Sequence, residues 1–353
     1  MIAAVVALAV LILSGRSQDL AAWARAASAS LGWPLGPLAA IAIYVVVLAA
    51  AWDILSFPFV FYRSYVLDRK YGLTSEPAGT WLADHLKALV LGLVLTLGAA
   101  LAVYGAASAS PAWWWLIMTG VFAIAAIAIA YVAPVWLLPI FYRFRPLDRE
   151  ALRERLLALS DRAGAPAIGV FEWGLGEKTS RANAALAGAG GTRRILVSDT
   201  LLKDYSDDEI EVILAHELSH HVHHDIWTSL AIETVVVAAA LLGSHLVIVR
   251  ASPVLGLRGP ADLAALPLVV AAGGAVSLLL APLSNAWSRR NEHRADRFAL
   301  TLTGRSGAFV SAMRRLGAQN LAEERPPRIV FWFFHTHPTI EDRIARARGE
   351  KTA

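Results

Sequence analysis

Long apolar segments constrain this chain more than any other feature of its sequence. Five of them lie near residues 36–60, 86–107, 112–140, 226–249 and 262–286, and each is long enough to cross a bilayer as a helix. Residues 1–14 are also apolar but short. Because no basic residue precedes them, they fit a marginal first helix better than a signal peptide. The pattern predicts a mainly α-helical, polytopic membrane protein with about six transmembrane helices.

The composition agrees with a membrane protein and limits the chemistry. Of the 353 residues, 57% are hydrophobic and 17% are charged, whereas a soluble domain carries about 25% charged residues. The chain has no cysteine, so any metal ion must be held by His, Asp or Glu. The net charge of +4 is modest and no nucleic-acid-binding motif is present, so we expect no nucleic-acid partner.

Basic residues are distributed unevenly between the loops. Six spans place the 61–85 loop, the 141–225 region and the tail after residue 287 on one side of the membrane. That side carries Arg63, Arg69, Lys70, Arg143, Arg145, Arg149, Arg289, Arg290 and Arg294. The positive-inside rule makes this side cytoplasmic. We therefore expect a multi-pass protein of a bacterial inner (plasma) membrane.

Residues 141–225 form one long polar insert between the fourth and fifth spans. It opens with an amphipathic helix that ends near Gly164 and carries Leu152, Leu156, Leu157 and Leu159. Two strand-like runs, IGVFEWG and RRILVSD, follow around a Gly- and Ala-rich stretch. The insert is too small for an independent domain with a large core, so we expect a small α+β cap packed on the helices.

The pentapeptide HELSH, His216 to His220, ends this insert. Residues four apart share one face of a helix, so His216 and His220 can bind one metal ion together. Glu217 between them can take a proton from metal-bound water. Upstream, Ser206 and Glu209 fit an S-x-x-E capping box, which predicts a helix beginning ten residues before His216. The alternative is a pair of solvated histidines on a surface helix.

A third ligand is available in SRRNEHRAD, residues 288–296. Catalytic zinc usually has three protein ligands and one open position. Glu292 can complete a His, His, Glu set, and Asp296 on the same helical face can accept a ring N–H from a ligand histidine. The alternative is that this segment is an ordinary basic amphipathic helix. Because the segment lies on the same side of the membrane as HELSH, we favour the ligand role and expect one Zn²⁺ per chain.

Five further segments resemble those of one known family in the same order. They are FPFVFYRSYVLDRKYGL (57–73), PIFYRFRPL (139–147), ANAALAGAGGTRRILVSDTLL (182–202), SRRNEHRAD (288–296) and HPTIEDR (337–343). The family is the type I CAAX prenyl endopeptidases, which are integral membrane zinc proteases; the chain is similar, more distantly, to the stress-induced membrane zinc proteases of bacteria. The resemblance covers most of the chain and implies a zinc metallopeptidase fold.

The resemblance also implies roles for single residues. His216, His220 and Glu292 match the zinc ligands of the family, and Glu217 matches its general base. The expected reaction is hydrolysis of a peptide bond through Glu217-assisted attack of zinc-bound water. We accordingly divide the chain into an amino-terminal transmembrane region, 1–140, with about four helices, and a zinc metallopeptidase region, 141–353. The second region includes two further spans and the cap.

Substrate contacts are implied by the resemblance as well. Asn183 and Ala184 match an edge strand that pairs with an extended substrate peptide. His337 and Arg343 match residues near the zinc ion, where they can stabilise the tetrahedral oxyanion. His335 is a rival for the His337 role, but only His337 is followed by proline as the motif requires. The expected partners are the lipid bilayer and a peptide or protein substrate, including a lipidated or membrane-bound one.

Differences from the family leave the substrate open. Eukaryotic members commonly have seven spans, a longer insert, and an aromatic residue where this chain has His293. A prenylated substrate and a role in membrane-protein quality control are therefore both compatible with the sequence. An intramembrane-cleaving protease is disfavoured, because the polar run SDDEIE precedes HELSH.

Other polar residues admit two interpretations each. A metal-ion transporter would explain the histidines and the intramembrane acids Asp53 and Glu233, but it needs neither Glu217 nor a peptide-binding strand. Those two acids fit either a polar chamber or hydrogen bonds between helices. The additional histidines, His221, His223 and His224, fit either a second metal site or the interfacial end of the helix. A catalytically silent scaffold is disfavoured by the complete set of ligands and base.

Overall fold

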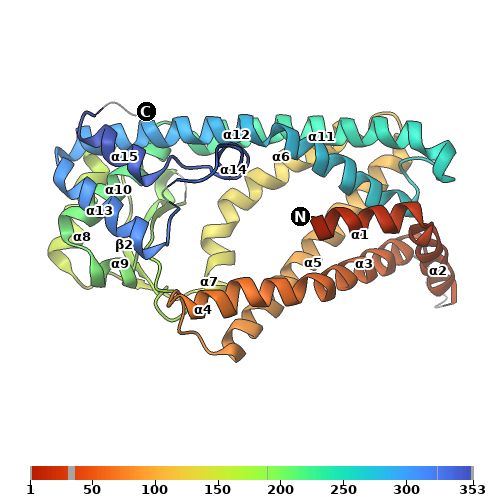
Figure 1. Ribbon diagram of the computed structural model, residues 1–353, viewed down its shortest axis with the longest axis horizontal. Coiled ribbons are helices and arrows are strands. Elements are labelled where there is room, and N and C mark those ends of the chain that lie inside the picture. The colour runs from red at the N-terminus through yellow and green to blue at the C-terminus, as the bar shows by residue number, and fades with distance from the viewer. Residues whose placement is uncertain (1, 31–35, 189, 324, 351–353) are drawn as a thin grey trace. The chain divides into compact units, whose positions relative to one another are not determined.

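The computed structural model describes residues 2–30, 36–188, 190–323 and 325–350. Most of these residues are helical, and one small sheet lies in the polar insert (Figure 1). The helices are α1 Ile2–Leu13, α2 Arg16–Ser30, α3 Gly36–Phe61, α4 Asp68–Lys70, α5 Ala78–Ala109, α6 Trp114–Val132, α7 Leu138–Phe141, α8 Glu150–Arg162, α9 Asp199–Asp204, α10 Asp207–Val222, α11 Asp225–Leu255, α12 Leu266–Thr303, α13 Ser306–Gln319, α14 Arg328–Phe334 and α15 Ile340–Ala347. The strands are β1 Phe144–Pro146, β2 Val170–Trp173, β3 Ala184–Ala187 and β4 Arg194–Ser198. Short π-helical turns, Tyr62–Leu67 and Ala133–Leu137, and 3₁₀ turns, Gly190–Thr192 and Leu263–Ala265, complete the regular structure.

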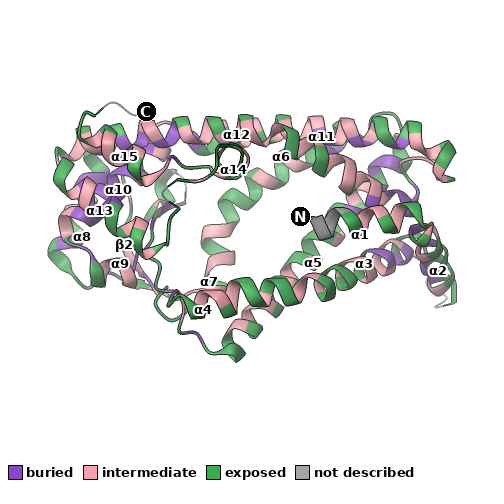
Figure 2. Ribbon diagram, in the orientation of Figure 1, coloured by how far each residue is buried: buried purple, intermediate pink, exposed green. Residues whose placement is uncertain are grey.

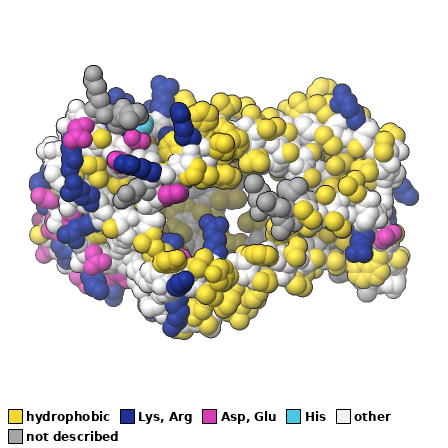
Figure 3. All heavy atoms as spheres, in the orientation of Figure 1, with side chains coloured by type: hydrophobic (Ala, Val, Ile, Leu, Met, Phe, Trp, Pro, Cys, Tyr) yellow, Lys and Arg dark blue, Asp and Glu magenta, His cyan; other side chains and the backbone are white. Residues whose placement is uncertain are grey.

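Five helical stretches of the described chain are long and apolar enough to cross a membrane. They are Gly36–Lys70, Ala78–Ala109, Trp114–Phe141, Asp225–Leu255 and Leu263–Thr303. The five long spans expected from the sequence are therefore confirmed as helices, and the mainly α class is confirmed with them. Helix α1 has 12 residues, fewer than the roughly 20 that a full span requires. Figure 3 shows mostly hydrophobic side chains over α3 and α11, and charged ones gathered over α8, α9, α10 and α13.

By their contacts the residues form two compact units. The first contains 1–63, 82–125 and 233–280, and the second contains 64–81, 126–232 and 281–353. The first unit is helical, and its apolar interior contains a few buried hydroxyl groups. Ser17 Oγ lies 2.7 Å from Tyr44 Oη and donates to the Ala264 carbonyl, while Tyr104 Oη donates to the Leu263 carbonyl over 2.9 Å. These bonds satisfy hydroxyl groups that burial would otherwise leave without partners.

The two acidic residues within apolar spans differ in their surroundings. Asp53 of α3 has its Oδ1 3.2 Å from Nε2 of His85 in α5. Of the two interpretations that the sequence allowed for this residue, pairing between helices matches its contact. Glu233 of α11 has an exposed side chain.

The sheet of the second unit has the order β1-β2-β4-β3. Strands β2 and β4 are parallel, with Val170 opposite Ile195, whereas β1 and β3 pair antiparallel with their neighbours. The strands expected in IGVFEWG and RRILVSD are confirmed as β2 and β4. The Gly- and Ala-rich stretch between them forms β3, which lies at the edge of the sheet.

The largest apolar core lies in the second unit. Leu152, Leu156 and Leu159 of α8 are buried, as the amphipathic spacing predicts. The helix ends before Gly164, whose φ of +76° is the left-handed conformation that commonly follows a helix. The same core includes Phe309 of α13, and buried residues follow α8, α10 and α13 in Figure 2. The insert is therefore completed by helices from the carboxyl-terminal part of the chain.

Candidate metal centre and active site

The amino terminus of α10 is fixed by the predicted capping box. Ser206 N–H donates to Glu209 Oε2 over 2.8 Å, and Glu209 N–H donates back to Ser206 Oγ. Ser311 Oγ of α13 also donates to Glu209, over 2.6 Å. The cap begins the helix and docks it on α13, so that HELSH occupies its last turns. His216 is buried there and His220 is half-buried.

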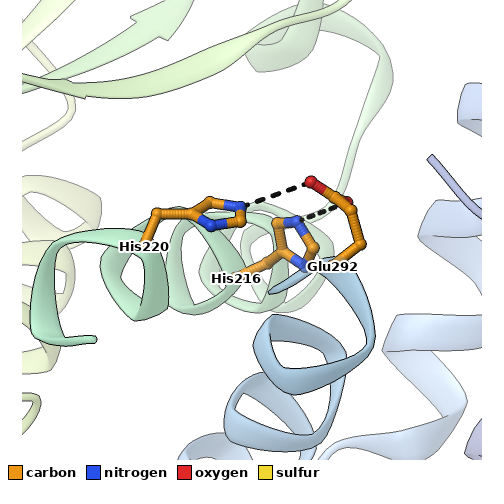
Figure 4. A group of neighbouring side chains, drawn as sticks. All are labelled: His216, His220 and Glu292. Atoms are coloured by element: carbon orange, nitrogen blue, oxygen red, sulfur yellow. Dashed lines mark ion pairs between the residues drawn. The ribbon is translucent and has the colours of Figure 1, made fainter. Parts of the chain in front are cut away.

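Two histidines of α10 and one glutamate of α12 point toward one another (Figure 4). Glu292 Oε2 lies 3.3 Å from His216 Nε2, and Glu292 Oε1 lies 3.5 Å from His220 Nε2. The three ligand atoms all lie within 4.8 Å of one another. Two ligands at about 2.1 Å from a tetrahedral zinc ion stand about 3.4 Å apart. The observed spacing therefore fits a metal ion held by all three side chains.

The hydrogen bonding of Glu292 supports the same conclusion. Its Oε2 is buried and makes no hydrogen bond within the described residues, although His216 Nε2 is 3.3 Å away. A buried carboxylate oxygen without a partner carries a desolvation cost. A cation between the carboxylate and the two imidazoles would remove that cost.

Asp296 and Arg343 surround the first histidine. Asp296 Oδ1 lies 2.9 Å from His216 Nδ1, and Arg343 donates to the same carboxylate through Nε and Nη2, over 2.9 and 2.6 Å. Burial disfavours the charged imidazole, but the nearby carboxylates of Asp296 and Glu292 outweigh it and raise the pKa of His216 to about 9. If His216 bound a metal ion through its other nitrogen, Nδ1 would keep its proton and donate a hydrogen bond to Asp296. The nearby Arg343 Nη2, 3.3 Å from Nδ1, then acts through Asp296.

Asp225 has the corresponding place beside the second histidine. Its Oδ2 lies 2.9 Å from His220 Nδ1, and its Oδ1 pairs with Arg294. Sequence reasoning missed this residue, which is the last position of the polar insert 141–225 and was given no role. The sequence does contain a signal for this contact, because Asp225 follows His220 by five residues. A carboxylate at that separation can reach the ring nitrogen of His220 that does not face the metal site.

The remaining expected catalytic residues lie around this cluster. Glu217 is half-buried, and its charge is among those that raise the pKa of Arg343 against the opposing effect of burial. His337 Nε2 lies 3.3 Å from Glu292 Oε1. The His335 ring packs instead near Phe331, with ring centroids 5.6 Å apart. Of the two rival histidines, the structure brings His337 to Glu292, the candidate metal-binding carboxylate.

Strand β3 presents one edge without a strand partner among the described residues. The Asn183 carbonyl accepts a hydrogen bond from Ser198 N–H of β4 over 2.9 Å. In an antiparallel pair the next hydrogen-bonded residue lies two positions on, so the backbone groups of Ala184 and Leu186 face the other edge. The Leu186 carbonyl there accepts from His221 Nε2 over 2.8 Å. Asn183 and Ala184 therefore lie in an edge strand beside α10, with the Asn183 carbonyl bonded to β4 and the Ala184 backbone facing the open edge. Their peptide-binding role stays a prediction.

The additional histidines make contacts of their own. Besides the bond from His221 to Leu186, His223 Nδ1 lies 3.0 Å from Ser219 Oγ. His224 adopts a φ of +57° just after α10. Within the described residues, His216, His220 and Glu292 are the only group of three or more such side chains placed so that they could hold a metal ion.

Comparisons with known proteins agree with this geometry. The sequence model of peptidase family M48 matches residues 146–351, and that of the CAAX prenyl protease N-terminal region, with five membrane helices, matches residues 1–143. The metalloprotease YhfN of Bacillus subtilis is 29% identical over 98% of this chain and 80% of its own length. CAAX prenyl protease 1 of Saccharomyces cerevisiae is 25% identical over 84% of this chain and 69% of its own length.

A solved structure shows the same fold. The crystal structure of S. mikatae Ste24p superposes with a TM-score of 0.81 and covers 95% of this chain and 81% of the Ste24p chain. The two sequences are 20% identical, so the likeness describes the fold alone. The chain therefore has a fold that is already known from a solved structure.

Proposed function

This chain belongs to peptidase family M48 and is a multi-pass membrane metalloprotease. We propose that it is a zinc endopeptidase with Glu217 as the general base. The observation that carries the proposal is the convergence of His216, His220 and Glu292 on one point. The buried, unpaired Oε2 of Glu292 supports it further. Zinc fits this donor set, because His, His, Glu with one open position is typical of catalytic zinc sites.

Each residue near the cluster has a distinct task in the proposed reaction. His216, His220 and Glu292 would hold the zinc ion, which when bound would act as a Lewis acid on a water molecule and on the scissile carbonyl. Glu217 takes the proton from the attacking water and delivers it to the leaving amine. Its half-buried position one residue after His216 supports that assignment.

The other residues bind the substrate or hold the ligands in place. A peptide extended along β3 can form backbone hydrogen bonds with Ala184, and Asn183 lies at the start of the same edge. His337, 3.3 Å from Glu292, can donate to the oxyanion that develops on the carbonyl. Arg343 positions Asp296, and through it His216, by its two hydrogen bonds to that carboxylate.

The proposed location is the plasma membrane, with the active site on the cytoplasmic side. The basic residues of the loops support this orientation. The proposed substrates are peptides or proteins that are membrane-bound or lipidated. A prenylated carboxyl terminus is the favoured class, because the yeast relative carries the name CAAX prenyl protease 1.

The proposal is tested with Glu217→Gln, purified in detergent and loaded with zinc. We expect one zinc ion per chain, as in the wild type, and a loss of peptide hydrolysis of about 10²- to 10⁴-fold, the usual contribution of a general base. Glu154→Gln changes an exposed glutamate of α8 and is the matched control.

A peptide panel completes the test. Prenylated and unprenylated peptides are incubated with wild type and variants, with and without chelator, and the products are identified by mass spectrometry. Undiminished cleavage by zinc-loaded Glu217→Gln would overturn the role of Glu217. Cleavage that resists chelation would overturn the zinc mechanism.

A further inference from the structure

A pocket of about 180 Å³ adjoins the candidate metal centre within the second unit. One of its walls is formed by His220, a proposed metal ligand, together with His221 of the same helix. This volume has room for several water molecules. Its contact with His220 places any occupant beside the reacting bond.

Arg193 is the charged residue of this pocket without a carboxylate partner. No ion pair involves it among the described residues, and its Nε is buried without a hydrogen-bond partner. Within the described residues Arg294 Nε likewise has no hydrogen bond, but Arg294 and Arg343 of the same unit form ion pairs with Asp225 and Asp296, which Arg193 does not. The described residues that line the pocket include no Asp or Glu. A half-buried guanidinium in these surroundings favours an anionic occupant, which would restore its hydrogen bonds.

Apart from His224, the remaining lining is apolar and aromatic. Tyr131 of α6 and Trp227 of α11 have ring centroids 6.0 Å apart, and Ile226 lies beside them in the lining. These residues can pack against the methylene groups of an amino-acid side chain. They can equally pack against the side chain of the last residue of a peptide. The pocket therefore combines a cation with an apolar wall, which fits a carboxylate on an aliphatic stem better than a free inorganic anion.

The edge of β3 leads a peptide to this pocket. Gly188, which follows β3, belongs to the lining. The Leu186 carbonyl accepts a hydrogen bond from His221, so it is not available to a peptide that pairs with the edge of β3. The free backbone acceptors of this edge therefore end at Leu186. A peptide lying along Ala184 and Leu186 thus leaves the strand where the pocket begins. Gly188 itself has a φ of +91°, and a Cβ there would approach the Thr192 carbonyl oxygen to 2.6 Å, so this turn requires glycine.

We infer that this pocket selects substrates by binding a peptide carboxylate through Arg193, close to the scissile bond. The inference rests on the proposed peptidase function and names the substrate feature that the site recognises. The carboxylate can belong to an Asp or Glu side chain or to the free carboxyl terminus of the peptide. The side-chain carboxylate and the terminal carboxylate would bind Arg193 through the same chemistry, and the experiment below distinguishes between them.

The test measures binding and hydrolysis separately. Binding is measured by titrating fluorescent peptides with the zinc-loaded Glu217→Gln protein, which is expected not to cleave them. Hydrolysis is measured as kcat/KM with the enzyme that retains Glu217. Each peptide is made as a free acid and as a carboxyl-terminal amide, and with Glu or Gln at each position flanking the cleaved bond. We expect one of these carboxylates to improve Kd and kcat/KM by about 10- to 100-fold, the usual range for a hydrogen bond to a charged group.

Arg193→Gln should abolish that preference and leave the amide or Gln peptide unchanged, while Arg193→Lys should retain part of it. The matched control is Arg194→Gln, because Arg194 is exposed and its guanidinium lies 5.5 Å from the Phe171 ring centroid. A preference lost on amidation identifies the peptide terminus, and one lost on Glu-to-Gln exchange identifies a side chain.

Two outcomes would overturn the inference. One is equal binding of acid and neutral peptides by the wild-type pocket, and the other is an equal loss for all peptides in Arg193→Gln. If carboxylate-dependent binding is found but no peptide is hydrolysed, the proposed peptidase function fails and the binding site stands.

Discussion

Asp296 and Arg343 form a doubly hydrogen-bonded pair, with Nε–Oδ2 and Nη2–Oδ1 distances of 2.9 and 2.6 Å. Both side chains are buried. The Asp296 carboxylate also lies 2.9 Å from His216 Nδ1, so a residue of α15 is linked through one carboxylate to a candidate metal ligand. Removing a partner from such a buried pair is costly, and the orientation of the histidine depends on it.

Arg343→Lys keeps the positive charge but cannot form two parallel hydrogen bonds to Asp296. We expect zinc affinity to fall by about 10- to 100-fold, as is typical when the group that orients a metal ligand is disturbed. Zinc retained during dialysis against graded chelator measures the effect. Arg346→Lys, an exposed residue of the same helix, is the control. Equal retention in the two variants would contradict the positioning role.

Asp225→Asn should weaken the metal site through the other histidine. The amide keeps the size of the side chain but cannot accept the His220 Nδ1 proton as strongly, so we expect zinc affinity to fall by about 10- to 100-fold. Asp204→Asn, at the exposed end of α9, provides the comparison. Competition with a fluorescent zinc indicator gives both affinities, and an unchanged value for Asp225→Asn would remove this residue from the metal centre.

His337→Ala and His335→Ala separate the two rival histidines. Only His337 has a ring nitrogen near Glu292, at 3.3 Å, so its loss should lower kcat by about 10²- to 10³-fold, as for one oxyanion donor. We expect His335→Ala to retain most activity, since its ring packs near Phe331. Steady-state kinetics with zinc content measured in parallel tests this, and a larger defect in His335→Ala would reverse the assignment.

Glu209 should make the stability of the second unit sensitive to acid. Burial acts to raise its pKa, but hydrogen bonds from Ser311 and Ser206 and the charge of Arg315 lower it below the ordinary 4.5. A carboxyl whose folded-state pKa is lowered stabilises the fold above its unfolded pKa, and this contribution is lost as the pH falls through the folded value. Glu209→Gln should therefore lose stability at neutral pH and show a flatter decline in acid.

Thermal unfolding in detergent between pH 3 and pH 7 measures this difference. Glu154→Gln, which changes an exposed residue of α8, should follow the wild-type curve. A Glu209→Gln curve parallel to that of the wild type across this range would show that the carboxylate is not coupled to folding.

The sequence by itself determined the parts of this protein that depend on neighbouring residues. Apolar runs predicted the five long helices, and the Ser206–Glu209 capping box predicted the start of α10. Helical periodicity then placed His216 and His220 on one face, and a second helix offered Glu292. The roles of Asn183 and His337 came only from resemblance to a family, because no local pattern distinguishes them from ordinary polar residues.

Only the tertiary structure decided which distant residues meet. It brought Arg343 to Asp296, across 47 positions of the chain, and Asp225 to His220 through the turn between two helices. It also placed His221 against the edge strand, 35 positions away, and Phe309 in the core of the insert. Periodicity describes a face of one element and cannot specify its packing partner. The packing of α10, α12 and α15 therefore determines which side chains surround the metal centre.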